Sequence, residues 1–264
     1  MKEYYVIGNK TSASLSPIIF NYWFNKYRID AKYGYLEWKN RRFDKLIEKT
    51  LLDKNIFGLN ITIPFKQKIM KHLHDADNHS KNINAVNCVS IKKKIKGFNT
   101  DWSGYYKTLP KKIKISKNSK ILLIGYGGAA LAIHYVLITK GFKNITVVNR
   151  SRKKIKFVKK TIFTKNDNNI GEHLKKADLI INTTPKNPIK KEYKTFVDKK
   201  TYLSDIVYNP KETSFLKQFP ENKKIYGIYM LLEQAILCFE IWFGFKPLID
   251  KKLIRILEKK IKWP

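Results

Sequence analysis

This sequence predicts an α/β fold in which helices cover two mostly parallel sheets, one sheet in each of two domains. Three observations support the prediction. Strand-like and helix-like segments alternate from the first residues onward. The 264 residues are enough for about two domains. A glycine-rich turn between an apolar strand and a helix of small residues lies near the middle of the chain.

The composition is that of a globular protein, with 43% hydrophobic residues. No stretch approaches the roughly 18 apolar residues of a membrane span, so we expect no membrane partner. Residues 1–8 lack the apolar core of a signal peptide and are typical of a first strand. Cys88 and Cys238 lie far apart in the sequence and are most simply explained as two reduced thiols. These features predict a cytoplasmic protein.

The formal net charge of +33 raises the question of nucleic-acid binding. However, only 6 of the 54 basic residues are arginine, and the lysines are spread through every segment. Proteins that read nucleic acids favour arginine, because its planar guanidinium pairs with phosphates and base edges. We therefore expect no specific nucleic-acid partner, and only weak nonspecific binding at low salt.

Two serines follow the first strand, in the loop that leads to a helix over residues 18–24. Ser16 before Pro17 is a favourable N-cap and first-turn pair, so helix capping alone explains Ser16. Ser14 lies two residues earlier in the same loop. Two hydroxyls at the carboxyl end of a strand also suit a ligand that has hydroxyl or carboxylate groups.

Residues 56–66 predict a strand that ends at a ligand-binding edge. Its apolar residues alternate with Asn60 and Thr62, so these two polar side chains share one face near the end of the strand. Pro64 cannot continue an interior strand and directs the chain toward a helix that begins near Lys66. Lys66 is thereby placed where open α/β sheets bind ligands.

Residues 85–91 and 95–101 flank a lysine-rich turn and predict a β-hairpin. Asn87, Asn99 and Asp101 are polar residues near the ends of its strands. Asp101 is able to cap the helix that is expected from about residue 102. In a chain with few acids, it is also a natural partner for a lysine.

Residues 121–130 predict the start of a dinucleotide-binding domain. Four apolar residues form a buried strand, a glycine turn follows, and small residues open a helix that runs to about residue 140. Gly125 permits the tight turn, Gly127 permits close approach of a pyrophosphate, and Ala130 lets helix and strand pack closely. The amide groups and the positive dipole end of the helix then face the phosphates.

The strand expected at residues 144–148 favours NADP over NAD. An NAD-binding chain usually has Asp or Glu about 20 residues after the turn, where it holds the ribose hydroxyls. This chain has Asn149 there, with Arg150, Arg152 and Lys153 close by. A solvated basic turn is the simpler alternative in a lysine-rich chain, but the absent acid and the nearby cations favour the 2′-phosphate of NADP.

Residues 177–185 and 201–210 predict two further strands that end in polar residues. Asp205 is better explained as a structural hydrogen-bond acceptor than as a reacting group. A last important helix opens at residue 227 and ends near Gly244. Met230 and Gln234 lie four residues apart and so share a face of that helix, although a helical methionine is usually part of a core.

Five motifs occur in order along the chain: Ser-Leu-Ser-Pro at 14–17, Asn-Ile-Thr-Ile-Pro-Phe-Lys at 60–66, Ala-Val-Asn at 85–87, Asn-Thr-Asp at 99–101 and Gly-Tyr-Gly-Gly-Ala-Ala at 125–130. Together they resemble the shikimate dehydrogenase family, which reduces 3-dehydroshikimate with NADPH in aromatic biosynthesis. The resemblance covers nearly the whole chain, and the second and fourth motifs are its most specific elements. The chain departs from the family at residues 10–13 and at Cys88, and residues 75–80 match it only loosely, but none of these residues is implied in the chemistry.

The resemblance implies a substrate-binding and catalytic domain of residues 1–103 plus 228–264, to which the C-terminal helices return. It implies a Rossmann-type NADP-binding domain of residues 104–227. Lys66 and Asp101 are the implied catalytic pair, and the substrate is a small molecule. The implied substrate-binding residues are Ser14, Ser16, Thr62, Asn87, Tyr208 and Gln234. The implied cofactor-binding residues are Gly125, Gly127, Gly128, Ala129, Asn149, Arg150, Arg152, Lys153, Thr183, Val207, Gly227 and Met230.

Two alternatives stand beside this interpretation. One is a quinate/shikimate dehydrogenase relative that uses NAD or accepts broader substrates. The other is a basic binding protein on an inactive dehydrogenase scaffold, which would bind nucleic acid tightly at physiological salt. We expect no metal, because His72 and His74 face different ways on the expected helix and the other histidines are isolated in the sequence. Monomer and homodimer are both compatible with the sequence.

Overall fold

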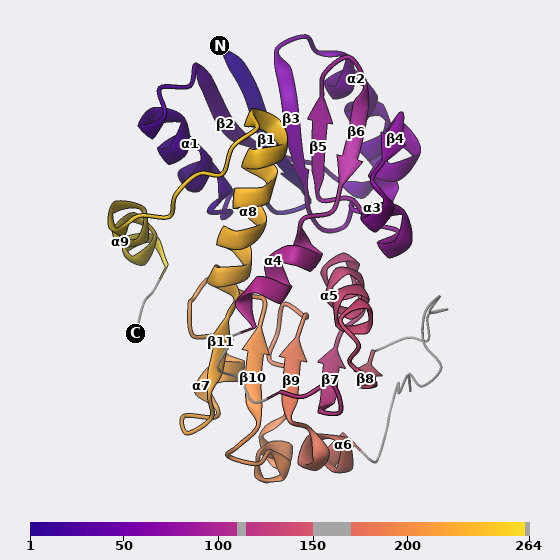
Figure 1. Ribbon diagram of the computed structural model, residues 1–264, viewed down its shortest axis with the longest axis vertical. Coiled ribbons are helices and arrows are strands. Elements are labelled where there is room, and N and C mark those ends of the chain that lie inside the picture. The colour runs from indigo at the N-terminus through magenta and orange to yellow at the C-terminus, as the bar shows by residue number, and fades with distance from the viewer. Residues whose placement is uncertain (110–114, 150–169, 262–264) are drawn as a thin grey trace. The chain divides into compact units, whose positions relative to one another are not determined.

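The computed structural model describes residues 1–109, 115–149 and 170–261 and divides into two compact units (Figure 1). Unit 1 comprises Met1–Gly104 and Leu232–Leu257, and unit 2 comprises Tyr105–Leu231 and Glu258–Pro264. Each unit holds one sheet accompanied by helices, so the predicted α/β class is confirmed. Within the described ranges, none of the helices is both long and apolar enough to cross a membrane.

Unit 1 contains a six-stranded mixed sheet. Its strands are β1 (Lys2–Gly8), β2 (Ala31–Glu37), β3 (Ile56–Ile61), β4 (Asp75–Ala76), β5 (Cys88–Ile91) and β6 (Ile95–Phe98). Their order is β2-β1-β3-β5-β6-β4. β1 is parallel to β2 and β3, whereas β5 is antiparallel to both of its neighbours. The predicted hairpin of β5 and β6 supplies the antiparallel pairings, and the other pairs are parallel, as the sequence predicts.

The helices of unit 1 differ from the expectation at two places. Lys66 is followed by a 3-10 segment, η2 (Lys68–His72), rather than by an α-helix that begins near it. Ser16 lies inside α1 (Ser16–Lys26), where Leu15 is the N-cap residue and makes no side-chain cap bond. The capping explanation of Ser16 is therefore wrong.

The remaining segments that lie wholly or partly in unit 1 are η1 (Asn40–Arg42), α2 (Phe43–Leu52), α3 (Asn78–Ile83), α4 (Asp101–Thr108), α8 (Gly227–Phe243) and α9 (Lys251–Lys260). Of these, α4, α8 and α9 each have residues in both units.

Aromatic packing fixes α8 against the sheet of unit 1. The ring of Trp242 lies 4.9 Å from that of Tyr4 in β1 and 5.1 Å from that of Phe20 in α1, and its Nε1 donates to the Val89 carbonyl over 3.0 Å. Any Cβ at Gly58 would lie 2.6 Å from the Trp242 ring, so glycine in β3 makes room for it. Gln234, Cys238 and Trp242 follow at intervals of four on one face of α8, so the Trp242 anchor also directs the first two toward the sheet.

Unit 2 contains a five-stranded sheet in which every pairing is parallel. Its strands are β7 (Lys120–Ile124), β8 (Asn144–Val148), β9 (Leu179–Asn182), β10 (Tyr202–Asp205) and β11 (Lys224–Tyr226), in the order β11-β10-β9-β7-β8. The other elements are α5 (Gly128–Thr139), α6 (Ile170–Lys176), α7 (Ser214–Lys217) and η3 (Lys191–Phe196). The chain passes from β7 to β8 on one side and returns to β9 on the other. This reversal makes β7 a topological switch point, as in a Rossmann fold.

Burial of His134 makes the folded chain sensitive to acid. His134 in α5 is 2% exposed, and desolvation lowers its pKa from 6.5 to about 4. Between these pH values the unfolded chain binds a proton that the folded chain does not, so stability falls as the pH drops. We expect His134→Leu to remove about 3 kcal/mol of the stability that the wild type loses between pH 7 and pH 4. Denaturant unfolding at several pH values measures this, and an unchanged pH dependence in His134→Leu would contradict it.

Candidate active site

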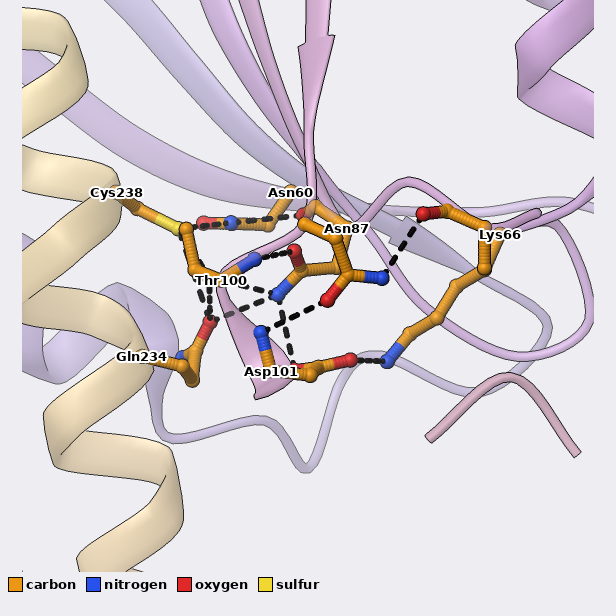
Figure 2. A network of polar contacts seen from close by, with 9 residues as sticks. Asn60, Lys66, Asn87, Thr100, Asp101, Gln234 and Cys238 are labelled. Atoms are coloured by element: carbon orange, nitrogen blue, oxygen red, sulfur yellow. Dashed lines mark hydrogen bonds and ion pairs between the residues drawn. The ribbon is translucent and has the colours of Figure 1, made fainter. Parts of the chain in front are cut away.

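A buried ion pair stands at the centre of the site in unit 1 (Figure 2). The Nζ of Lys66 lies 2.5 Å from Oδ2 of Asp101, and the two residues are 9% and 5% exposed. Lys66 follows the carboxyl end of β3, and Asp101 is the first residue of α4. The sequence separates them by 35 positions, and the fold brings their side chains together, while their catalytic role stays a prediction. A buried charge is tolerated when a partner of opposite charge and hydrogen bonds compensate it.

Asn87 connects this pair to the rest of the network. Its Nδ2 lies 2.9 Å from Oδ1 of Asp101, 2.9 Å from Oγ1 of Thr100 and 3.2 Å from Oε1 of Gln234. Its Oδ1 accepts a 2.6 Å hydrogen bond from the Thr100 amide. These contacts fix which end of the Asn87 amide is the donor. One carboxylate oxygen of Asp101 thus faces Asn87 and the other faces Lys66.

Thr100 and Cys238 fix the side chain of Gln234. Its Oε1 lies near three donors, namely Asn87 Nδ2, Thr100 Oγ1 at 3.4 Å and Cys238 Sγ at 3.7 Å. Because these donors gather on the oxygen, the opposite end of the amide, Nε2, is its donor end. Figure 2 shows Gln234 and Cys238 projecting from α8 toward Asn87 and Thr100.

The sequence motifs hold one another in place. Asn99 donates to the Ala85 carbonyl over 2.8 Å and accepts from the Asp101 amide over 3.1 Å. Asn60 donates to the Asn87 carbonyl over 3.0 Å, and its Oδ1 accepts from the hydroxyl of Tyr33 over 2.7 Å. The strands that contain the motifs are therefore joined by side chains as well as by the sheet. Rigid support of this kind keeps reacting groups in one geometry.

Ser14, Ser16 and Thr62 lie at the same edge of the sheet. β1 and β3 are parallel neighbours, so the loop after β1 and the residue after β3 meet at their carboxyl ends. Ser14 Oγ accepts from the Ser16 amide over 3.2 Å. A Cβ at Gly8, the last residue of β1, would lie 2.5 Å from Cγ2 of Thr62. The structure gives these three residues local contacts, and their role toward a ligand stays a prediction.

The arrangement suits proton transfer to a small polar molecule. A lysine held by a carboxylate supplies a cation and a proton, while neighbouring amides and hydroxyls supply hydrogen bonds for hydroxyl or carboxylate groups. Among the residues that the structure describes, no three His, Cys, Asp or Glu side chains come together in a way that could hold a metal ion.

The glycine turn of unit 2 has the geometry that a dinucleotide needs. Gly125 has φ +93°, and a Cβ there would lie 2.6 Å from Oγ1 of Thr183, so no other residue fits. A Cβ at Gly127 would meet no described atom within 4 Å, so this side of the turn is open. Gly127 is also the N-cap residue of α5 and makes no side-chain cap bond. The first amides of α5, at Gly128 and Ala129, can therefore face phosphate oxygens.

The other residues that are predicted to bind the cofactor follow strands of the unit 2 sheet or belong to α8, and three lie outside the described residues. Asn149 directly follows β8, and Thr183 follows β9 with its Oγ1 2.8 Å from the Ile124 carbonyl. A Cβ at Gly227 would lie 2.7 Å from the Val207 carbonyl oxygen, so these two segments touch. Met230 is buried in α8. Arg150, Arg152 and Lys153 lie outside the described residues.

Asp205 is the last residue of β10, and Tyr208 follows that strand. Asp205 accepts from Thr213 Oγ1 over 2.6 Å and from the Val207 amide over 3.0 Å, and burial raises its pKa. These contacts agree with the structural role that the sequence favoured. Tyr208 is partly buried in unit 2, and its substrate-binding role stays a prediction.

Sequence reasoning assigned no role to Thr100 or Cys238. Thr100 is the middle residue of the Asn-Thr-Asp motif. Cys238 follows Gln234 by four residues, so the shared helix face was a usable signal. The structure shows that both contact Gln234.

Comparison with known proteins places these observations in context. Two family models match, "Shikimate dehydrogenase substrate binding domain" over residues 6–89 and "Shikimate / quinate 5-dehydrogenase" over residues 108–211. A shikimate dehydrogenase (NADP(+)) of Clostridium beijerinckii is 38% identical over 251 residues, with 92% of each chain covered. One of Clostridium perfringens is 36% identical, with 99% of each chain covered. The crystal structure of shikimate dehydrogenase 1 from Peptoclostridium difficile matches with a TM-score of 0.82 at 30% identity, covering 98% of this chain and 97% of that chain.

Removal of the Thr100 hydroxyl should loosen the network. We expect Thr100→Val to lower the free energy of unfolding by about 1–3 kcal/mol, because buried groups of Asn87 and Gln234 lose a partner. Thr100→Ser keeps the hydroxyl and should stay within about 0.5 kcal/mol of the wild type. Denaturant unfolding of the three proteins measures the difference. Equal stability of the Val and Ser variants would show that the hydroxyl contributes nothing.

Proposed function

Since the chain belongs to the shikimate dehydrogenase family, we propose that it interconverts 3-dehydroshikimate and shikimate with NADPH and NADP⁺. Within this activity, Lys66 and Asp101 perform the proton chemistry. The main support is the buried Lys66–Asp101 pair, set among amide and hydroxyl groups that suit a polyhydroxylated acid.

The reduction places negative charge on the ketone oxygen of the ring. The bound cofactor supplies a hydride to the carbonyl carbon. Lys66 donates from Nζ to the oxygen, stabilises its developing charge and then gives it a proton. Asp101 holds Nζ through Oδ2 and orients it, while Oδ1 is held by Asn87. In the reverse direction, Lys66 receives the proton of the alcohol.

The substrate is held by side chains that tolerate only a polar ring. Gln234 donates to its hydroxyl groups, and Thr100 and Cys238 fix the orientation of the Gln234 amide. Asn87 keeps the substrate-binding role that the family resemblance assigns to it, and its Nδ2 also contacts Asp101, Thr100 and Gln234. Ser14, Ser16 and Thr62 supply hydroxyls at the carboxyl edge of the unit 1 sheet. Tyr208 of unit 2 keeps the substrate-binding role that the family resemblance assigns to it.

The two units have different functions. Unit 1 is the substrate-binding and catalytic domain, and unit 2 is the NADP-binding domain. The glycine turn and the first amides of α5 would hold the pyrophosphate, and Asn149, directly after β8, would face the 2′-phosphate. Thr183, Val207, Gly227 and Met230 would contact the nicotinamide half of the cofactor. The protein works in the cytoplasm, a location supported by the two free buried thiols of Cys88 and Cys238.

Lys66→Ala should abolish turnover without abolishing cofactor binding. We expect kcat to fall by about 10²- to 10⁴-fold, because the variant lacks the proton donor, while the Kd for NADP⁺ stays at its wild-type value. The matched control is Lys68→Ala, which removes an exposed lysine two positions away. Steady-state kinetics and NADP⁺ titration give both numbers. If Lys66→Ala keeps more than a tenth of the wild-type kcat, Lys66 is not the proton donor.

A four-way assay separates the alternatives. The wild type is measured with NADP⁺ and NAD⁺, each with shikimate and quinate. The highest kcat/KM is expected with NADP⁺ and shikimate. Preference for NAD⁺ or quinate would indicate the quinate/shikimate relative instead. Absence of any turnover, together with tight nucleic-acid binding at physiological salt, would indicate an inactive binding protein.

The residue after β8 should control the choice of cofactor. We expect Asn149→Asp to lower kcat/KM for NADP⁺ by roughly tenfold or more, because a carboxylate repels the 2′-phosphate. The value for NAD⁺ should rise relative to it. The matched control is Asn144→Asp, which adds the same charge at the exposed amino end of the same strand. Equal loss in both variants would mean that net charge, rather than position, causes the effect.

A further inference from the structure

The glycine turn contains a buried tyrosine that the cofactor assignment does not use. Tyr126 lies between Gly125 and Gly127, and it is 5% exposed although Gly127 beside it is exposed. Its hydroxyl lies 2.7 Å from Nδ1 of His134, two turns along α5, and the two rings meet edge to face with centroids 5.5 Å apart. The side chain that leaves the turn is therefore fixed to the helix that the turn begins.

The direction of this hydrogen bond follows from the burial of both residues. Desolvation raises the pKa of Tyr126, so the phenol keeps its proton and is the donor. Desolvation also lowers the pKa of His134 to about 4, so the imidazole is neutral near pH 7 and Nδ1 is the acceptor. The histidine proton then lies on Nε2. That nitrogen is buried and has no hydrogen-bond partner among the described residues.

A buried donor without a partner lowers stability, so His134 is better explained if it has a role besides packing. The turn offers one. On one side Gly125 has a φ of +93°, and a Cβ there would lie 2.6 Å from Oγ1 of Thr183, so the backbone of the turn runs close to the residue after β9. On the other side Tyr126 is tied to α5. Between these two attachments Gly127 faces open space, so they decide where its amide and the next amides of α5 point.

We propose that the Tyr126–His134 hydrogen bond is a positioning contact that holds the glycine turn ready for the dinucleotide pyrophosphate. The inference rests on the proposed use of NADP. Tyr126 and His134 do not touch the cofactor in this scheme. They act through the backbone of the turn, which they keep from moving when no cofactor is bound. Preorganisation of this kind strengthens binding because less freedom is lost on association.

The test is an NADP⁺ titration of Tyr126→Phe, followed by intrinsic fluorescence or calorimetry. We expect the Kd to rise about three- to tenfold, the effect of one lost hydrogen bond, with an unchanged KM for shikimate. The matched control is Tyr105→Phe, which removes another buried phenol of unit 2, bonded to Ser204 Oγ over 3.2 Å and outside the turn. Both variants should melt at a lower temperature, but only Tyr126→Phe should bind NADP⁺ more weakly.

A mutant cycle with His134→Leu shows whether the hydrogen bond itself is responsible. Each single variant and the double variant should raise the Kd by the same factor, because each removes the same bond. Independent, multiplying effects would overturn the proposal, and so would a wild-type Kd in Tyr126→Phe or equal weakening in Tyr105→Phe. If the wild type itself fails to bind NADP⁺, the proposed function fails and this inference fails with it. A wild type that binds alongside an unaffected Tyr126→Phe rejects the positioning role alone.

Discussion

The contact between Lys66 Nζ and Asp101 Oδ2 is the constraint on which the rest of unit 1 depends. Removing two charges from water costs several kcal/mol for each ion, and mutual attraction offsets this only when the geometry is good and the remaining polar atoms are bonded. The structure meets these conditions, since Asn87 holds the second oxygen of Asp101 and Asn99 holds its amide. A pair of apolar residues would often be as stable at such a place. The ion pair is therefore better explained by the chemistry it allows than by the stability it adds.

The same constraint explains why the site and the scaffold use the same residues. Asn60 is part of β3, yet its side chain bonds the Asn87 carbonyl and contacts Cys238 in α8 over 3.1 Å. Thr100 precedes α4 and bonds both Asn87 and Gln234. A substitution at any of these positions changes both the packing of the strands and the orientation of a hydrogen-bond donor in the site. Effects of substitutions within this cluster should consequently be non-additive, as they are in other shared hydrogen-bond networks.

Much of the fold could be predicted because its signals are local. The apolar run at 121–124, the glycine turn and the helix that follows define β7 and α5 without reference to anything distant. The 85–101 hairpin was equally clear, but its effect on sheet direction depends on β3, which sequence patterns alone do not pair with it. Ser16 was misjudged as a cap because its neighbour Pro17 fits the rule, whereas the helix already includes Ser16. Lys66 and Asp101 were identified by family resemblance, since no spacing rule joins residues 35 positions apart.

In a chain so rich in lysine, burial distinguishes Lys66 from the other lysines, whereas sequence position does not. Position at a sheet edge gave Lys66 little distinction among so many lysines. Among the described residues, Lys66 is the only lysine that is buried. Exposed lysines interact weakly with their surroundings because water and salt screen them. A buried lysine against a carboxylate interacts with it more strongly, because the effective dielectric constant is lower away from water. A chain with net charge +33 can therefore keep a site whose polarity is set chiefly by one cation, one anion and a few amides.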